Sequence, residues 1–453
     1  MHANHSLISR LRHLDLATAD AWRDRLVVWA AAATAGLAVV AFTSLAVLAD
    51  QLFQMLYQQA AWSLLLITPL SGVGILALTR RVAPMAAGSG IPQVMVAMTP
   101  GLPASLVSRF VSLKIVVTKM FLGCAALAAG FSLGREGPSV QISASVMHAF
   151  RGLLSPRSRI SPADLLLAGG AAGIAAAFNA PLAGIMFAIE ELSRRFEART
   201  SGLIISAIVL AGVIAVSVLG NFTYFGRFSA AAIAPGVLGP VLICMVLAGT
   251  LGGLFSRVLL MASTPTRRFS PLRWRATHPY LFAAACGLIV AGIGLASSGT
   301  LFGSGYAYTR HLIEGTDSSP IIETAGKFLS TVASYWSGIP GGIFAPALAI
   351  GAGIGQDVSH YFPAAHQTLI AIGMVAFLAA ATQAPLTAFI IVMEMTDGHQ
   401  MVLLLMASAF VANLLAKLVS KPLYKTLADA QLMTTTQAPP APTEAASGKT
   451  PTQ

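Results

Sequence analysis

Three short strings rich in glycine and proline interrupt the apolar stretches of this chain, and each could present backbone N–H groups to an anion. They are Gly88-Ser-Gly-Ile-Pro92, Gly134-Arg-Glu-Gly-Pro138 and Gly341-Gly-Ile-Phe-Ala-Pro346. Glycine allows a tight turn and proline fits the first turn of a helix, so each string predicts a helix start. The first N–H groups of a helix have no partner within it, and the helix dipole there favours negative charge. Three such starts in apolar surroundings predict an anion pathway.

One of these strings contains a carboxylate. Glu136 lies between Arg135 and Gly137, and a buried acid of this kind is a functional candidate because burying its charge is costly without partners. The N–H groups that attract an anion would also stabilise the ionised carboxylate. Glu136 could therefore occupy an anion site itself, and protonation would expel it. The alternative interpretation is a structural carboxylate that caps its own helix or pairs with Arg135.

A second acidic pair, Glu190 and Glu191, ends an apolar segment shortly before Arg194 and Arg195. Its position alone favours two acids at a membrane surface that pair with these arginines. The sequence gives little indication of enzyme chemistry. The sequence contains no nucleophile–base pair and no His-Glu-x-x-His motif, so we do not expect an enzyme.

The elements that position these residues are predicted to be membrane helices. Hydrophobic residues make up 56% of the 453 residues, charged residues make up 10%, and the mean hydropathy is +0.75. A polar segment of about 25 residues precedes the first apolar run and no cleavage site follows soon after, which predicts a retained membrane helix. We expect an all-α polytopic membrane protein with tilted and broken helices. Apolar runs of spanning length occur at 26–48, 61–79, 203–219, 241–261, 279–297, 369–388 and 401–419.

The net charge of +11 comes from short basic clusters between the apolar runs. A nucleic-acid-binding groove would need a continuous basic stripe with interleaved aromatic residues, and none occurs. Basic loops orient membrane proteins, and the basic segments near both ends predict that both termini are cytoplasmic, at the inner (plasma) membrane. Cys124, Cys244 and Cys286 lie at no ligand-like spacing, so neither a disulfide nor a metal site is expected. No cofactor is expected either.

The chain also contains an internal repeat. Residues 178–191 match residues 382–395 in pattern, so that Ala-Pro-Leu and one glutamate (Glu190 or Glu394) coincide. Paired halves with broken helices place a binding site at their interface, but the sequence leaves open whether the halves are parallel or inverted. The domains expected from these patterns are a cytoplasmic segment at 1–25, a membrane domain at 26–428 with halves at about 27–219 and 236–421, and a disordered cytoplasmic tail at 429–453.

The three strings, the Asn179-Ala-Pro-Leu-Ala-Gly motif and Lys421-Pro-Leu-Tyr424 occur together in a characteristic order and spacing. In these motifs the chain resembles the CLC family of chloride channels and proton–chloride exchangers over roughly residues 25–428. The resemblance implies a homodimer in the lipid bilayer. Each subunit would contain its own anion pore between two inverted-repeat halves.

The resemblance also implies an anion site. Hydroxyl groups of Ser89 and Tyr424 and backbone N–H groups of Ile343 and Phe344 would bind chloride. Neutral donors can bind chloride and still release it, as conduction requires. Without the motif context, Tyr424 would be interpreted as an interfacial aromatic anchor. The other residues expected to shape the selectivity filter are Gly88, Gly90, Ile91, Pro92, Gly134, Arg135, Gly137, Pro138, Gly342, Ala345 and Pro346.

The two glutamates decide the predicted transport mode. Glu136 resembles the gating glutamate of the family, and Glu191 matches the internal proton-transfer glutamate of its exchangers, where channels commonly have a non-acidic residue. The resemblance therefore predicts exchange of chloride for protons. The alternative is a passive voltage- or pH-gated chloride channel of the same fold. The chain differs from many relatives at Gln93, where they have an acid, and Lys119 is expected to be a buried structural cation near the Glu136 segment.

Overall fold

The computed structural model describes residues 19–193, 201–220, 224–225, 235–262, 270–315 and 321–437. All regular elements over these residues are helical, which confirms the predicted all-α fold. A π-helical turn at Ala188–Ser193 continues α9. The helices are α2 (Ala19–Ala60), α3 (Leu64–Val82), α4 (Ile91–Ala97), α5 (Ala104–Phe110), α6 (Leu113–Ala128), α7 (Glu136–Ala149), α8 (Pro162–Phe178), α9 (Pro181–Phe187), α10 (Ser201–Leu219), α11 (Leu238–Met261), α12 (Ser270–Thr277), α13 (Pro279–Ala296), α14 (Tyr306–Glu314), α15 (Ile321–Trp336), α16 (Phe344–Ser359), α17 (His366–Thr382), α18 (Pro385–Thr396), α19 (Val402–Val419) and α20 (Leu423–Gln437).

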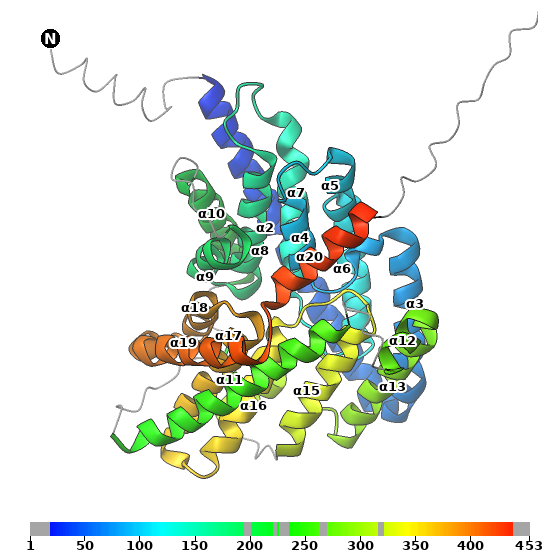
Figure 1. Cartoon of the computed structure of the whole chain (residues 1–453), viewed down its shortest axis with the longest axis vertical. Helices are drawn as coiled ribbons and strands as arrows, with labels where there is room; N and C mark the ends of the chain where they lie inside the picture. Colours follow the sequence, from blue (N-terminus) through cyan, green and yellow to red (C-terminus); the bar gives the residue numbers. More distant parts are fainter. Residues whose placement is uncertain are drawn as a thin grey trace, which may run out of the picture.

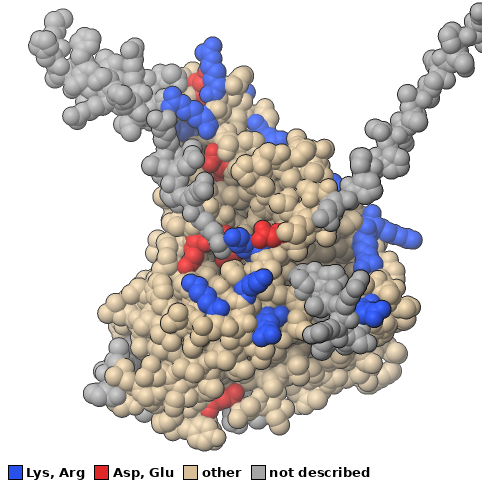
Figure 2. Space-filling view, viewed as in Figure 1, with Lys and Arg blue, Asp and Glu red and all other residues tan. Residues whose placement is uncertain are grey.

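The surface of the protein suits a lipid environment. Large apolar side chains such as Leu70, Leu414 and Leu418 are exposed, and Figure 2 shows that most of the visible surface carries no charge. Among the described residues, 6 helical stretches are long and apolar enough to cross a membrane: Ala19–Val82, Ala104–Ala128, Gly202–Leu219, Leu238–Met261, Pro279–Ala296 and His399–Val419.

Two predicted boundaries were wrong. The run at 369–388 is not one span, because Gln383 is left-handed (φ 59°) between α17 and α18, and Pro385 disfavours a helical residue before it. The predicted tail at 429–453 starts too early because α20 continues to Gln437. Helix α2 contains the apolar run at 26–48 and begins at Ala19, inside the segment expected at 1–25. Residues 1–18 and 438–453 of the two predicted terminal segments lie outside the described part of the chain.

The internal repeat appears as two matching helix pairs. Helices α8 and α17 each have 17 residues. Each ends at a left-handed residue, Asn179 (φ 56°) in the first half and Gln383 (φ 59°) in the second. Each is followed by a helix that begins at a proline, Pro181 in α9 and Pro385 in α18. The same residue pattern thus forms the same local structure in both halves.

Two repeat-related glutamates join the halves and show how they are oriented. Glu190 accepts hydrogen bonds from the first turn of α18, and Glu394 accepts them from the first turn of α9. Because the end of each segment lies at the start of the other, α9 and α18 run antiparallel where they pack together. Figure 1 shows the two helices as neighbours. This antiparallel packing is the arrangement expected of inverted halves. The donors, at 2.8–3.2 Å, are the N–H groups of Leu386 and Thr387 for Glu190, and of Leu182 and Ala183 for Glu394.

These carboxylates should contribute measurably to stability. Glu190→Ala and Glu394→Ala each remove acceptors for two N–H groups at a helix start, and we expect each to cost about 1–2 kcal/mol, the usual value of a lost helix cap. Thermal unfolding of the detergent-purified variants measures this. The control is Glu314→Ala, which removes only an exposed ion pair with Arg310 and should change little. Equal melting temperatures for all three variants would contradict the capping role.

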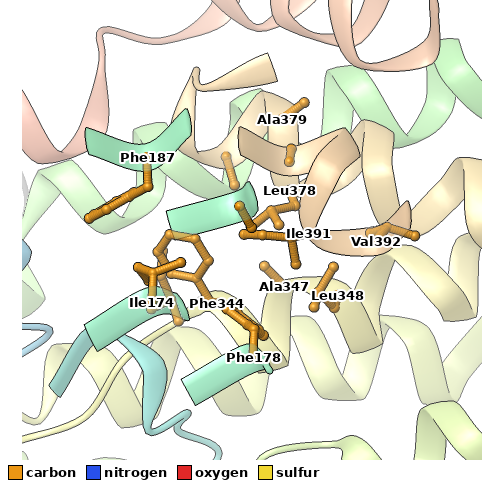
Figure 3. Close-up of a cluster of buried hydrophobic side chains, with 14 of the residues drawn as sticks. Ile174, Phe178, Phe187, Phe344, Ala347, Leu348, Leu378, Ala379, Ile391 and Val392 are labelled. Carbon is orange, nitrogen blue, oxygen red and sulfur yellow. The ribbon is translucent and has the colours of Figure 1, made fainter. Parts of the chain in front are cut away.

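The centre of the protein consists of α7, α8, α16 and α17, whose side chains are almost all buried. Gly351 and Gly373 allow α16 and α17 to approach closely, since a Cβ on either would overlap backbone of the other helix. Phe344, at the start of α16, packs in this core against Phe178 and Phe187, with ring centroids 6.0 and 6.4 Å away (Figure 3). This packing fixes the start of α16.

Candidate functional site

The three glycine strings meet at the centre of the protein. Gly88 N donates to Ile339 O and Gly341 N donates to Gly88 O, each at 3.1 Å. Gly134 and Gly342 exchange two backbone hydrogen bonds of 2.7 Å. Backbone hydrogen bonds therefore join the segments at the starts of α4, α7 and α16. The anion-pathway prediction requires that these three helix starts lie together.

Ser89 lies at this meeting point because two glycines make room for it. Gly90 follows it with φ 105°, a left-handed conformation that glycine adopts without strain. A Cβ at Gly137 would overlap the Ser89 hydroxyl oxygen, so the start of α7 must carry glycine there. Ser89 is buried, and its hydroxyl has no hydrogen-bond partner within the described part of the chain.

Tyr424 approaches the same point from α20. Its ring is fully buried and stacks on Phe344, with ring centroids 6.0 Å apart and planes 9° apart. Its hydroxyl interacts with the Ser89 side chain, but neither hydroxyl has a further hydrogen-bond partner among the described residues. Burying an unsatisfied hydroxyl is costly, and two of them together suit an acceptor such as an anion. An interfacial anchor would instead have an exposed ring.

Ile343 and Phe344 form the start of α16. Both are buried, with Ile343 at the N-cap and Phe344 as the first helical residue. N–H groups at this position have no acceptor within the helix. The next N–H group, of Ala345, donates to Glu136 Oε2 at 3.3 Å. The structure thus brings Ser89, Tyr424 and the start of α16 together.

Glu136 is fully buried as the first residue of α7, but its carboxylate points to another helix. Oε2 accepts from Ala345 N at the start of α16, and Oε1 accepts from the Tyr306 hydroxyl at 2.8 Å. Arg135 donates to the Tyr224 hydroxyl at 2.7 Å, so its contact is with an aromatic residue. Arg135 also interacts electrostatically with Glu136, but the hydrogen bonds of the carboxylate come from α14 and α16. The carboxylate lies where the helix start would attract an anion.

Glu191 lies on the α20 side of the site, near enough to Tyr424 to interact with it electrostatically. It is buried in the π-helical turn that continues α9, and it lines a cavity of about 180 Å³. The α4 residues that line this cavity come from the far end of that helix from Ser89. The predicted partners Arg194 and Arg195 lie outside the described residues. The other lining residues are Met95, Val96, Thr99, Leu192, Ser193, Lys425, Ala428, Asp429 and Leu432.

Lys119 is fully buried, as predicted, and the structure supplies its partner. Its Nζ donates to Gln141 Oε1 at 2.7 Å. The Gln141 amide nitrogen donates in turn to Met85 O and Phe110 O, at 3.0 and 2.7 Å. Gly90 packs directly against this pair, because a Cβ there would lie 3.0 Å from Lys119 Nζ. The network supports the loop that carries Ser89.

Gln93 is buried, and its side-chain nitrogen donates to Ala87 O at 2.7 Å. A carboxylate cannot donate this bond, so the amide has a local role in holding the same loop. Sequence reasoning missed Tyr306, the second partner of Glu136. The only signal for it was the string Gly303-Ser-Gly305 directly before it, which resembles Gly88-Ser-Gly90 in the other half.

Comparison with known proteins agrees with these features. The family model for voltage gated chloride channels matches residues 71–417. The chain is 34% identical over 375 residues to the H(+)/Cl(-) exchange transporter ClcA of Yersinia pestis bv. Antiqua (strain Angola), covering 77% of this chain and 74% of that protein. It is 34% identical over 367 residues to ClcA of Cronobacter sakazakii (strain ATCC BAA-894), covering 77% and 76%.

Two solved structures share the fold. The X-ray crystal structure of a slow cyanobacterial Cl-/H+ antiporter superposes with a TM-score of 0.77 and 26% sequence identity, covering 92% of this chain and 99% of that one. A CLC-type fluoride/proton antiporter superposes with a TM-score of 0.72 at 22% identity, covering 89% and 96%. The inverted halves and broken helices are therefore an architecture that these proteins have in common.

Proposed function

The chain belongs to the family of voltage gated chloride channels, and we propose that it is a secondary transporter that exchanges chloride for protons. The curated relatives are named as exchangers of these two ions, and so is the similar cyanobacterial antiporter. One observation carries the proposal: the Glu136 carboxylate is bound at the start of α16. A group that is either ionised in the place of an anion or protonated and displaced links the two ions.

In this proposal a chloride ion is bound between α4, α16 and α20. The hydroxyls of Ser89 and Tyr424 donate to it from two sides, and the N–H groups of Ile343 and Phe344 complete the site. All four donors are neutral. They bind the ion less tightly than a fixed positive charge would, so the ion can be released. The two buried hydroxyls, which interact with each other and have no further partner among the described residues, support this arrangement.

Protons take a route that only partly coincides with that of chloride. Glu191 receives them from the cavity beside α20 and passes them on toward Glu136. That cavity is lined by neither Ser89 nor Tyr424, which supports separate routes on this side of the protein. The second candidate, a passive chloride channel of the same fold, would need no buried acid at Glu191.

The protein is further proposed to be a homodimer in the inner membrane with both termini in the cytoplasm. Chloride and protons are its transported ions, and no cofactor takes part. Figure 2 shows Lys and Arg side chains on the face along which α20 runs, and basic residues favour the cytoplasmic side. Labelling of single cysteines at Ser420 and at loop positions on the opposite face, from outside intact cells, tests this orientation.

Tyr424→Ala should weaken chloride binding by roughly 1–3 kcal/mol, the range for an unmade hydrogen bond with a charged partner. The substitution also removes the buried ring that separates the anion site from the α20 face. Chloride should then cross this point without coupled proton transport. We expect a higher chloride-to-proton ratio, measured with ion electrodes on proteoliposomes, and weaker binding by calorimetry. Tyr424→Phe, which keeps the ring, separates the two effects. Unchanged affinity and coupling would place the anion elsewhere.

Proton uptake by proteoliposomes tests the proposed function. Vesicles loaded with chloride and diluted into a low-chloride buffer should take up protons against a proton gradient as chloride leaves, once the membrane potential is clamped with valinomycin and potassium. Vesicles without protein are the control. Chloride efflux without proton movement would assign the protein to the passive channels.

A further inference from the structure

The gating glutamate has a second hydrogen-bond donor that comes from the other half of the chain. Tyr306, the first residue of α14, donates its hydroxyl to Glu136 Oε1 at 2.8 Å. The carboxylate is thus bound on both oxygens, by Ala345 N on one and by Tyr306 on the other. A hydrogen bond to a charged acceptor is stronger than one between neutral groups. It stabilises the ionised carboxylate in the place of the anion.

Tyr306 is held in position by the loop that precedes it. Gly305 has φ 90° and packs tightly, since a Cβ there would lie 2.6 Å from Ala349 Cβ on α16. The buried ammonium of Lys327 donates to Leu301 O at 3.1 Å and to Gly303 O at 2.8 Å. These contacts therefore hold the backbone on the N-terminal side of Tyr306 in place.

Its ring is fixed as well. It stacks on the ring of Tyr224, with ring centroids 5.1 Å apart and planes 22° apart. It also packs against the ring of Phe225, with ring centroids 5.7 Å apart. The Arg135 guanidinium lies 5.5 Å from the centroid of the Tyr306 ring and 5.6 Å from that of Tyr224. The phenol of Tyr224 is used differently, because it accepts from Arg135 and donates to Ala177 O. Of these two phenols, it is that of Tyr306 that donates to the carboxylate.

We infer that Tyr306 is a positioning residue that latches the Glu136 carboxylate in the anion path and so makes chloride compete against a stabilised carboxylate. The inference rests on the proposed function of Glu136. Loss of the phenol oxygen alone should leave the ring packing in place while weakening the competitor. Chloride should then bind more tightly and displace the carboxylate more easily.

Tyr306→Phe tests the latch. We expect chloride affinity, measured by calorimetry on the purified full-length protein, to rise roughly tenfold, which corresponds to about 1.4 kcal/mol. Chloride turnover in proteoliposomes should rise as well, with the chloride-to-proton ratio unchanged because both glutamates remain. Tyr224→Phe is the matched control, since it removes a neighbouring phenol oxygen that is hydrogen-bonded to Arg135 and Ala177, and it should leave chloride affinity unchanged.

The decisive comparison uses the Glu136→Ala background, where no side-chain oxygen is present to accept from Tyr306. There, Tyr306→Phe should add nothing to chloride affinity, which would also show that the substitution leaves the anion site folded. Wild-type affinity in the Tyr306→Phe single variant, or the same tenfold gain in the Glu136→Ala background, would overturn the inference. The calorimetry does not depend on proton coupling. A wild-type protein that fails to exchange protons would therefore reject the proposed function separately.

Discussion

Glu191→Gln is expected to abolish proton movement while leaving substantial chloride transport. The side chain is buried beside a cavity that Ser89 and Tyr424 do not line, so glutamine, which has nearly the same shape, should not disturb the anion path. Glutamine cannot carry a proton at this position, and the proton route is broken there. Chloride and proton fluxes recorded together from proteoliposomes measure both effects in one sample.

The matched control for this variant is Glu314→Gln, which changes an exposed glutamate at the end of α14 and should exchange both ions as the wild type does. If Glu191→Gln still drives protons with the wild-type ratio, Glu191 is only a structural acid. If chloride transport disappears together with proton transport, the two routes are not separate as proposed.

Glu136→Gln is expected to remove both proton coupling and the pH dependence of chloride flux. Glutamine resembles the protonated carboxyl group, so the variant should behave as if the gating residue were permanently protonated. Chloride flux should therefore persist, at a rate that does not change with pH. The ionised carboxylate accepts from Ala345 N on one oxygen and from the Tyr306 hydroxyl on the other, whereas glutamine has a single acceptor oxygen and no charge to hold in the place of the anion.

Chloride flux of wild type and Glu136→Gln, measured in parallel over a series of symmetric pH values, provides the test. The wild type should change its rate with pH and the variant should not. A variant whose flux keeps the wild-type pH profile would show that a different group senses the proton. A variant that moves protons with chloride would exclude Glu136 from the coupling.

Local sequence rules were sufficient to find the starts of α4, α7 and α16, because glycine and proline fix the backbone conformation at those points. The same rules predicted that Glu136 would lie at a helix start. They could not show that its carboxylate reaches Ala345 and Tyr306, since those contacts join distant parts of the chain. The string Gly303-Ser-Gly305 before Tyr306 marks a turn, but it does not show that the phenol reaches Glu136.

The internal repeat was likewise only partly predictable from the sequence. The Ala-Pro-Leu motif predicted two related halves, and both copies form a left-handed helix end followed by a helix that begins at proline. The orientation of the halves required the cross-capping by Glu190 and Glu394, which is a tertiary contact. The apolar run at 369–388 misled the span prediction because hydropathy does not register a break at Gln383. The start of the tail was misjudged because composition is a weak guide to where a terminal helix ends.

The most direct test of coupled exchange is the reversal potential of the reconstituted protein under a fixed chloride gradient, with and without an added pH gradient. Coupled exchange predicts a reversal potential displaced from the chloride equilibrium potential, and a further shift when the pH gradient is imposed. A reversal potential that stays at the chloride equilibrium value in both conditions would contradict the exchange of chloride for protons.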